Sequence, residues 1–409
     1  PDHSVATDPR TTDPQQNANP HVIALRRDTG QFGVRLFDVG QQGHGIVHVI
    51  TPELGIALPG LTVAIGDSHT CTHGALGALA WGVGQGELLH ILATQTCVQH
   101  KPATMRVTLD GTLPPGIGGK DLILYLIGQL GAAYGNGYAV EYAGSAVRAL
   151  PMEARFTLCN MSVEWGARYG MIAPDDTAFA WLEGRPYAPK GALWDAAVAD
   201  WRTLASDANA RFDHEVRLDV SGLVPQVTWG NTLDMVLPID GRMPDPAAEA
   251  DAGKRAGMEA AMRYMALAPG QAIEGLPIQR VFIGSCTNSR ITDLRAAAAV
   301  VRGRHVAPGV QAWVVPGSEQ VRREAQAEGL DQVFMQAGFD WRTPGCSMCL
   351  GGNGDTIGPG ERAVSTANRN FAGRQGPGSR THIAGPQLAA ASACAGYITD
   401  PRKLAGAGA

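Results

Sequence analysis

Short apolar runs that end in glycine alternate along the chain with longer segments of helical periodicity. Residues 61–66 (LTVAIG) indicate a buried strand, and small and apolar residues follow at helical spacing over 67–96. The same order of strand, polar turn and helix recurs at 280–303 and at 310–337. Strands that alternate with helices are typical of mainly parallel sheets covered by helices on both faces. The pattern therefore predicts an α/β fold.

The segments between these repeats follow other patterns and indicate further domains. Residues 105–131 combine the signals of a strand, a Pro-Gly turn and a helix, and residues 155–174 indicate a helix of small and apolar residues. Residues 225–255 are rich in loop signals and include PDPAAEADAGKR, which we expect to be an exposed link. Domain boundaries near 104 and 225 give the predicted domains 1–104, 105–225 and 226–409. The final LAGAGA indicates a frayed tail.

Composition narrows the class of protein. Hydrophobic residues make up 44% and charged residues 17% of the 409 positions, which indicates a large packed core rather than a disordered chain. The net charge of −5, without a basic stripe, argues against nucleic acid as the main partner. No run of about 18 uncharged apolar residues is present, so we expect no membrane span.

The first residues and the cysteine count indicate where the protein works. The chain opens with Pro-Asp-His, without methionine and without a signal region, so we expect its true N-terminus to be missing. Seven scattered cysteines are too few for a disulfide framework, and their odd number favours a reducing compartment. We therefore expect a cytoplasmic protein.

Two cysteines stand two residues apart in WRTPGCSMCLGGN, at positions 346 and 349. They could form a redox dithiol, half of a zinc site, part of a cluster site, or a pair of core side chains. Glycines follow the pair where a redox motif would open a helix, and no second C-x-x-C completes a zinc ribbon. A third thiol, Cys286, follows the predicted strand in VFIGSCTNSR, at a helix start that favours a thiolate. Three thiolates can hold a cubane cluster and leave one iron open for substrate.

Histidines and acids gather near glycine turns and strand ends. The residues concerned are Asp2, His3, His48, Asp67 and His69. A single histidine is more often structural, but several in such places favour a site. Asn160 and Glu164 stand four positions apart on a predicted helix face, amid small and apolar residues. A buried carboxylate needs a partner, and a histidine is a natural one.

A polar loop, STANRNFAGRQG (365–376), carries Arg369 and Arg374. Arginines in such loops are commonly solvated surface residues. Their guanidinium groups also bind carboxylates through two hydrogen bonds. Because this loop follows the cysteine pair closely, the two arginines are candidate anchors for a substrate with several carboxylates.

Taken together, these segments resemble the aconitase family of iron–sulfur hydro-lyases. The resemblance is carried by GDSHTCTHGALGALAWGVG, TLCNMSVEWGAR, QVTWG, VFIGSCTNSRITDLRAA, PGCSMCLGGN and STANRNFAGRQGPGSRTH, which run from Asp2 to about Pro401. It implies three α/β/α domains around a central cluster. The first of them is incomplete at its N-terminus, the third carries the cluster cysteines, and the family's swivelling fourth domain is absent from this chain.

The resemblance also assigns roles to residues. It implies that one 4Fe–4S cluster per subunit is bound by Cys286, Cys346 and Cys349. It implies acid and histidine pairs around the site, namely Asp2 with His3, Asp67 with His48, and Glu164 with His69. The position of His3 is that of the acid thought to protonate the leaving hydroxyl. Contacts to substrate or cluster are implied for Ser68, Asn160, Leu350, Asn368, Arg369 and Arg374.

The implied reaction is dehydration and rehydration of a 2-substituted malate. Thr72, which stands where true aconitases have asparagine, favours the branch that converts 2-isopropylmalate to 3-isopropylmalate through isopropylmaleate in leucine biosynthesis. The run CLGGNGD departs from the more usual CLAMN, so methylmalate, citraconate, benzylmalate and homocitrate stay open as substrates. In this branch the base serine and a substrate arginine lie on a separate small subunit. We therefore expect a heterodimer, and a large chain that is inactive alone.

Other classes of protein stay open at this stage. Some relatives in this family bind RNA when they lack the cluster, although the acidic net charge weighs against that function. A purely structural paralogue or a zinc protein is the other alternative. The three cysteines and the paired histidines are all present, which favours an enzyme.

Overall fold

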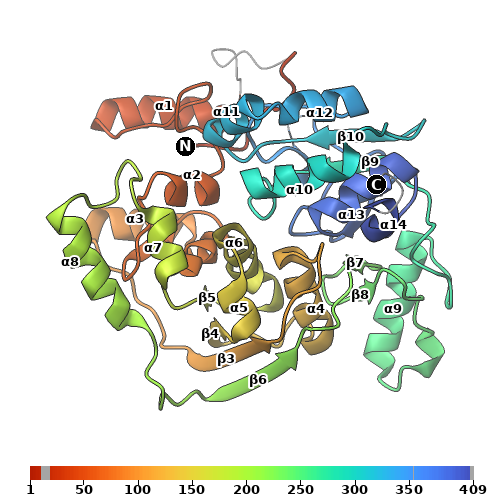
Figure 1. Ribbon diagram of the computed structural model, residues 1–409, viewed down its shortest axis with the longest axis horizontal. Helices are drawn as coiled ribbons and strands as arrows, with labels where there is room; N and C mark the ends of the chain where they lie inside the picture. The colour runs from red at the N-terminus through yellow and green to blue at the C-terminus, as the bar shows by residue number, and fades with distance from the viewer. Residues whose placement is uncertain (11–18, 353, 406–409) are drawn as a thin grey trace. The chain divides into compact units, whose positions relative to one another are not determined.

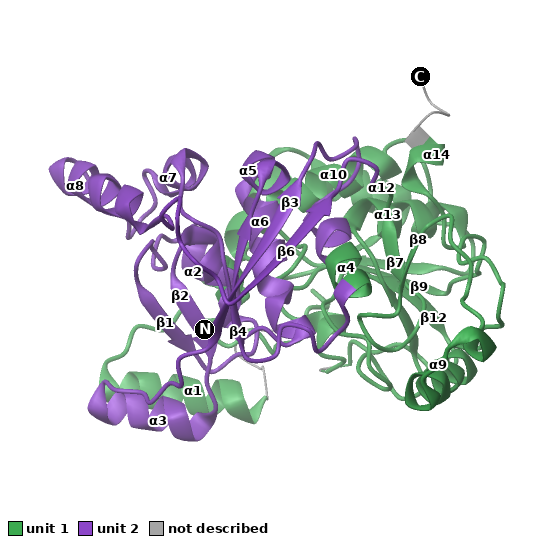
Figure 2. Ribbon diagram, turned by 90° about the horizontal axis from the view of Figure 1, so that it is seen from below, with its two compact units in different colours: residues 1–50, 124–129, 224–409 green, residues 51–123, 130–223 purple. Residues whose placement is uncertain are grey.

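The computed structural model describes residues 1–10, 19–352 and 354–405. They form two compact units (Figure 2). Unit 1 comprises 1–50, 124–129 and 224–409, and unit 2 comprises 51–123 and 130–223. The predicted division into three domains near 104 and 225 stays a prediction, and the end of the predicted tail, 406–409, lies outside the described residues. Within those residues, no helix is both long enough and apolar enough to cross a membrane.

Unit 1 is built on a five-stranded parallel sheet with the order β11-β10-β9-β12-β13. Its strands are β9 (Arg280–Ile283), β10 (Gln311–Val314), β11 (Asp340–Trp341), β12 (Arg362–Ser365) and β13 (Arg380–Ile383). An antiparallel pair is formed by β7 (Gln226–Thr228) and β8 (Val236–Pro238). The helices are α1 (Pro20–Phe32), α9 (Ala252–Met265), α10 (Ile291–Val301), α11 (Glu319–Ala327), α12 (Leu330–Ala337), α13 (Pro386–Ala395) and α14 (Pro401–Ala405), with 3-10 turns η4 (Pro246–Ala248) and η5 (Ser347–Cys349).

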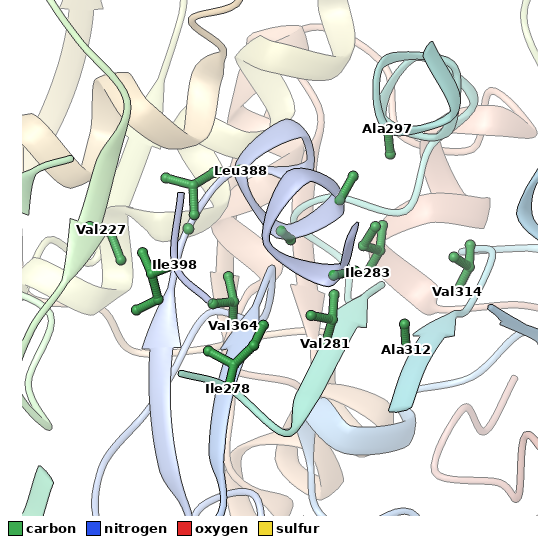
Figure 3. Packing of buried hydrophobic residues seen from close by; sticks show 14 of the residues in the cluster. Val227, Ile278, Val281, Ile283, Ala297, Ala312, Val314, Val364, Leu388 and Ile398 are labelled. Carbon is green, nitrogen blue, oxygen red and sulfur yellow. The ribbon is translucent and has the colours of Figure 1, made fainter. Parts of the chain in front are cut away.

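The core of unit 1 lies between this sheet and its helices (Figures 1 and 3). Val281 and Ile283 of β9, Val314 of β10 and Val364 of β12 are all fully buried. Leu388 of α13 belongs to the same cluster. Burying each large apolar side chain stabilises the fold by about 1.5–3 kcal/mol. Because the central strands are buried, their residues form short apolar runs, which is the pattern the sequence shows.

Helix α10 shows how the sequence produces these elements. The side chain of Asp293 accepts a hydrogen bond from the backbone N–H of Arg290, 3.0 Å away, and so caps the helix start. Leu294, Ala297, Ala298 and Val301 repeat at helical spacing and are all buried. The predicted order of strand, turn and helix over 280–303 is therefore confirmed.

Unit 2 contains two parallel sheets. A four-stranded sheet has the order β5-β4-β3-β6. Its strands are β3 (Ala103–Asp110), β4 (Tyr138–Ala143), β5 (Tyr169–Met171) and β6 (His214–Asp219), and β1 (Thr62–Ile65) pairs separately with β2 (Leu79–Gly82). Its helices are α3 (Gln85–Thr94), α5 (Ser145–Ala149), α6 (Met152–Asn160), α7 (Asp176–Leu182) and α8 (Ala192–Trp201), with 3-10 turns η1 (Thr70–Leu76), η2 (Met161–Trp165) and η3 (Arg202–Leu204). Two helices, α2 (Val47–Glu53) and α4 (Gly119–Leu130), hold residues of both units.

Two expectations about helices in unit 2 were wrong. Residues 67–96 form η1, β2 and α3 in turn rather than helix alone, because Gly77, at φ +79°, ends η1. A Cβ on Gly74 would lie 1.9 Å from the backbone oxygen of Gly170, so small residues there reflect close packing of η1 on β5. Likewise, the helix predicted over 155–174 ends early, and β5 follows it after Gly166 at φ +94°.

In unit 1, the helix predicted within 310–337 divides into α11 and α12 at Gly329, which has φ +70°. The predicted exposed link at 244–255 contains η4 and the first residues of α9. The α/β fold class with parallel sheets is confirmed.

Candidate functional site

The three cysteines singled out in the sequence lie in unit 1 on two loops. Cys286 follows the carboxyl end of β9, and Cys346 and Cys349 stand at either end of the turn that contains η5. Asn368, on the loop after β12, connects two of the thiols. Its amide nitrogen lies 3.3 Å from Cys286 Sγ, and its amide oxygen lies 3.3 Å from Cys349 Sγ. The fold therefore brings two loops more than 60 positions apart onto one polar side chain.

A serine next to a cysteine adopts the left-handed backbone conformation on each loop. Ser285 precedes Cys286 and has φ +76°, and Ser347 follows Cys346 and has φ +47°. Residues other than glycine seldom adopt this conformation, which costs about 1–3 kcal/mol. Ser285 Oγ also lies 3.3 Å from Cys349 Sγ. Strain beside each of the two cysteine loops is typical of a functional site.

The chemistry of these donors fits an iron–sulfur cluster. Cys286 and Cys349 are 7% and 5% exposed, and Cys346 is half-buried. Across the described ranges, no three His, Cys, Asp or Glu side chains converge on one ion position. A four-iron cluster takes each thiolate on a different iron, so its ligands do not have to converge on one point. Asn368 and Ser285 provide the polar hydrogen-bonding groups that tune cluster sulfur ligands.

The N-terminal segment lies beside the loop of the cysteine pair. The backbone N–H of Cys346 donates to the backbone oxygen of His3 at 2.9 Å. The Asp2 carboxylate accepts from the N–H of Ser4 at 2.8 Å, and the Asp2 backbone oxygen lies 3.0 Å from Nε2 of His44. His3 Nδ1 accepts a longer bond, 3.5 Å, from the N–H of Val47 in α2. The structure thus brings His3 to the cysteine loop, and the proposed orientation of His3 by Asp2 stays a prediction.

Arg290 joins the Cys286 turn to the helix that carries His48. Its guanidinium donates to the backbone oxygen of Cys286 at 3.0 Å and to that of His48 at 3.1 Å. Arg290 is only 3% exposed. Our sequence analysis did not single out this residue, although the motif SCTNSR contains it. A buried cation that binds two backbone oxygens fixes both segments in place.

In unit 2, candidate residues follow the carboxyl end of β1. A cavity of about 460 Å³ opens there, and its lining includes Asp67, Ser68 and Arg168. Ligands of parallel α/β sheets commonly bind at this end of the strands. Arg168 was not among the candidates from the sequence, and the only signal for it is its place in the motif TLCNMSVEWGAR.

His69 and Glu164 form a buried pair in unit 2. Nε2 of His69 lies 2.6 Å from Oε1 of Glu164, and the two side chains are 6% and 9% exposed. On the other side of the ring, Nδ1 lies 3.2 Å from Ser68 Oγ. Asn160 donates from its amide nitrogen to Thr72 Oγ1 at 2.8 Å. This part of unit 2 therefore holds a histidine fixed at both ring nitrogens.

The remaining candidates lie in unit 1. Arg369 is half-buried on the loop after β12. The guanidinium of Arg374 lies 5.6 Å from the centre of the Phe371 ring, and its Nε is buried without a hydrogen-bond partner in the described part of the chain. Leu350, next to Cys349, is 41% exposed. Because His48 belongs to unit 1 and Asp67 to unit 2, their pairing stays a prediction.

Comparison with known proteins places this arrangement in a family. A family model described as the aconitase family (aconitate hydratase) matches residues 1–396. The chain therefore belongs to the aconitase family.

Individual relatives are more specific. The chain is 59% identical over 404 residues to "3-isopropylmalate dehydratase large subunit 1" of Bradyrhizobium diazoefficiens, which covers 99% of this chain and 85% of that protein. It is 53% identical over 410 residues to the "3-isopropylmalate dehydratase large subunit" of Roseiflexus castenholzii, with coverage of 99% and 87%. The crystal structure of Thermococcus kodakaraensis aconitase X (holo-form) aligns over 86% of this chain and 72% of that one, with a TM-score of 0.43 and 11% identity.

Proposed function

We propose that this chain is the large, cluster-binding subunit of a 3-isopropylmalate dehydratase. It would interconvert 2-isopropylmalate and 3-isopropylmalate through isopropylmaleate, a step of leucine biosynthesis. The observation that carries the proposal is the meeting of Cys286 and Cys349 at Asn368, in a chain that is 59% identical to a protein of that name. The words "large subunit" in the names of both relatives support a small-subunit partner. The seven free thiols support a reducing, cytoplasmic compartment.

Cys286, Cys346 and Cys349 would hold one 4Fe–4S cluster. When bound, such a cluster supplies Lewis-acid chemistry toward a substrate hydroxyl and carboxylate. The chain itself keeps the sulfur atoms at 7% and 5% exposure for Cys286 and Cys349, which excludes most water from their surroundings. The Asn368 amide and the Ser285 hydroxyl orient the same sulfur atoms.

His69 can hold a proton at a defined atom. Glu164, 2.6 Å from Nε2, accepts the hydrogen bond of an Nε2–H and so favours the ring tautomer that carries its proton there. Nδ1 is then free to accept from the Ser68 hydroxyl, 3.2 Å away, or to take a proton itself. Removing or returning the elements of water requires proton transfer of this kind. By the family resemblance, the base that removes the carbon-bound proton comes from the small subunit.

Arg369 and Arg374 are the proposed carboxylate anchors. Arg374 Nε is buried and unpartnered among the residues that the structure describes, and a buried donor of this kind is costly unless a ligand binds it. A substrate carboxylate would accept from Nε and a terminal nitrogen together. Such charge-assisted bonds would also stabilise the negative charge that develops when the carbon-bound proton leaves.

The experiment that tests this function uses the full chain with a small subunit, reconstituted anaerobically with iron and sulfide. Formation of the unsaturated product is then followed with 2-isopropylmalate, methylmalate, benzylmalate, homocitrate and citrate. The proposal predicts the highest kcat/KM for 2-isopropylmalate and no turnover by the chain alone. A higher kcat/KM for another malate would overturn the substrate assignment. Full turnover without the small subunit would overturn the need for a partner.

A further inference from the structure

A buried carboxylate outside the candidate residues receives three hydrogen bonds near the cysteine pair. Asp355 accepts from Thr7 Oγ1 at 2.6 Å, from Ser347 Oγ at 2.9 Å and from Arg342 Nη1 at 2.8 Å. None of the four residues is more than 4% exposed. The three donors come from the N-terminal segment, from η5 and from the residue after β11. One side chain therefore holds together three parts of the chain that are distant in sequence.

Asp355 acts directly on the turn between the two cysteines. Ser347 stands immediately after Cys346 and has φ +47°, a conformation that an isolated serine seldom adopts. The hydrogen bond from its hydroxyl to Asp355 holds this residue in place from the side-chain end. Arg342 is itself fixed, since its guanidinium lies 3.6 Å from the centre of the Trp313 ring. The carboxylate therefore has a rigid, charged partner and can impose its geometry on the turn.

The N-terminal segment is attached to the same loop at two further points. The N–H of Cys346 donates to the backbone oxygen of His3, and the N–H of Thr343 donates to that of Thr7, each at 2.9 Å. The Thr7 side chain then reaches Asp355. Displacement of the carboxylate would loosen both the cysteine turn and the segment that carries His3.

We propose that Asp355 is a positioning residue that fixes the turn from Cys346 to Cys349 and the His3 segment to each other. This inference rests on the proposed function only in that these cysteines are the proposed cluster ligands. The packing itself is present in the cluster-free chain. Asp355→Asn is the sharpest change, because it keeps the shape, removes the charge and turns an amide toward donor groups.

The test is the rate at which iodoacetamide alkylates individual cysteines of the full, cluster-free chain, measured by mass spectrometry. A buried thiol such as Cys349 reacts only when its surroundings open. Asp355→Asn should raise the Cys349 rate about tenfold or more, since it breaks hydrogen bonds to a buried charge. Cys394, half-buried in α13, should keep its rate. The control is Glu361→Gln, which breaks another ion pair of unit 1, with Arg280 at the start of β9, and should leave both rates unchanged.

Two changes at Ser347 separate the hydrogen bond from the backbone conformation. Ser347→Ala loses the bond to Asp355 and keeps the cost of positive φ, whereas Ser347→Gly loses the bond but adopts positive φ freely. If Asp355 acts by holding this turn, the alanine variant should alkylate at Cys349 faster than the glycine variant. Equal rates for the two would contradict that action.

An unchanged Cys349 rate in Asp355→Asn would overturn the inference. Equal acceleration at Cys349 and Cys394 would also overturn it, because that result indicates general loosening of unit 1. Iron binding by the wild-type chain is measured separately. Failure of the wild type to bind iron would contradict the proposed function and would leave the alkylation result to decide the role of Asp355.

Discussion

His382 lies fully buried in β13 between an arginine and a backbone oxygen. Its Nε2 is 2.7 Å from Nη1 of Arg362, and its Nδ1 is 2.7 Å from the backbone oxygen of Thr228. Because arginine can only donate, Nε2 must accept and Nδ1 must carry the proton. Burial, and then the nearby charge of Arg362, lower the pKa of His382 to about 3. The folded protein therefore holds this histidine neutral.

The lowered pKa makes stability depend on pH in a defined window. An unfolded histidine has a pKa of about 6.5, so between about pH 6.5 and 3 the unfolded chain binds a proton that the folded chain rejects. Stability from this group is fully present above pH 6.5 and falls by about 1.4 kcal/mol for each pH unit below it.

His382→Gln removes the titration and keeps an acceptor for Arg362. It also loses the donor to the Thr228 oxygen, which should cost about 2 kcal/mol at pH 7.5. The wild type loses the same amount through protonation of His382 after about 1.5 pH units below 6.5. The two stability curves should therefore cross at about pH 5, and the variant should be the more stable protein below that pH.

The assay is urea unfolding of both proteins at several pH values from 7.5 to 4.5, since other titrating groups are common to both and cancel in the difference. A difference in the free energy of unfolding that shrinks and changes sign near pH 5 supports the reasoning. A constant difference across this range would refute the claim that His382 is held neutral.

Three further changes test other parts of the account. Glu164→Gln should lower kcat about 100-fold, with a smaller effect on KM, because it removes the carboxylate that fixes the proton of His69; steady-state turnover with the small subunit checks this. Arg290→Met should speed iron loss to a chelator more than Arg290→Lys, since lysine can still reach one of the two backbone oxygens. Gly74→Ala should destabilise unit 2 by about 3 kcal/mol or more in thermal unfolding, because its Cβ would meet the backbone of Gly170.

Each of these has an outcome that contradicts it. An unchanged kcat in Glu164→Gln would remove His69 from the proton chemistry. Equal iron loss in both Arg290 variants would mean that its hydrogen bonds do not hold the Cys286 turn. A stable Gly74→Ala would show that η1 and β5 can separate at little cost.

Local sequence signals were enough for the strands and helices whose apolar pattern is undisturbed. The runs at 61–66 and 280–284 are short, apolar and closed by glycine, and both form strands. Strand β2 was missed because LAWG lies inside a long run of small and apolar residues that has helical spacing as well. The strand forms there because tertiary pairing with β1 outweighs the local preference.

The candidate site shows the same division. Cysteines, histidines and arginines could be singled out because their chemistry is visible in the residue type. Arg290 and Asp355 could not, since their meaning lies in partners that are distant along the chain. Arg290 binds the backbone of His48, 242 positions away, and Asp355 binds Thr7, 348 positions away. Such contacts depend on the packed fold, and a motif does not encode them locally.

The most direct test of the central claim is the content of iron and acid-labile sulfide per chain after anaerobic reconstitution. The account predicts about four of each in the wild type, with a large loss in Cys286→Ser, Cys346→Ser and Cys349→Ser and no loss in Cys394→Ser, whose thiol lies in α13. A wild-type chain that binds no iron, or three cysteine variants that bind as much as the wild type, would contradict it.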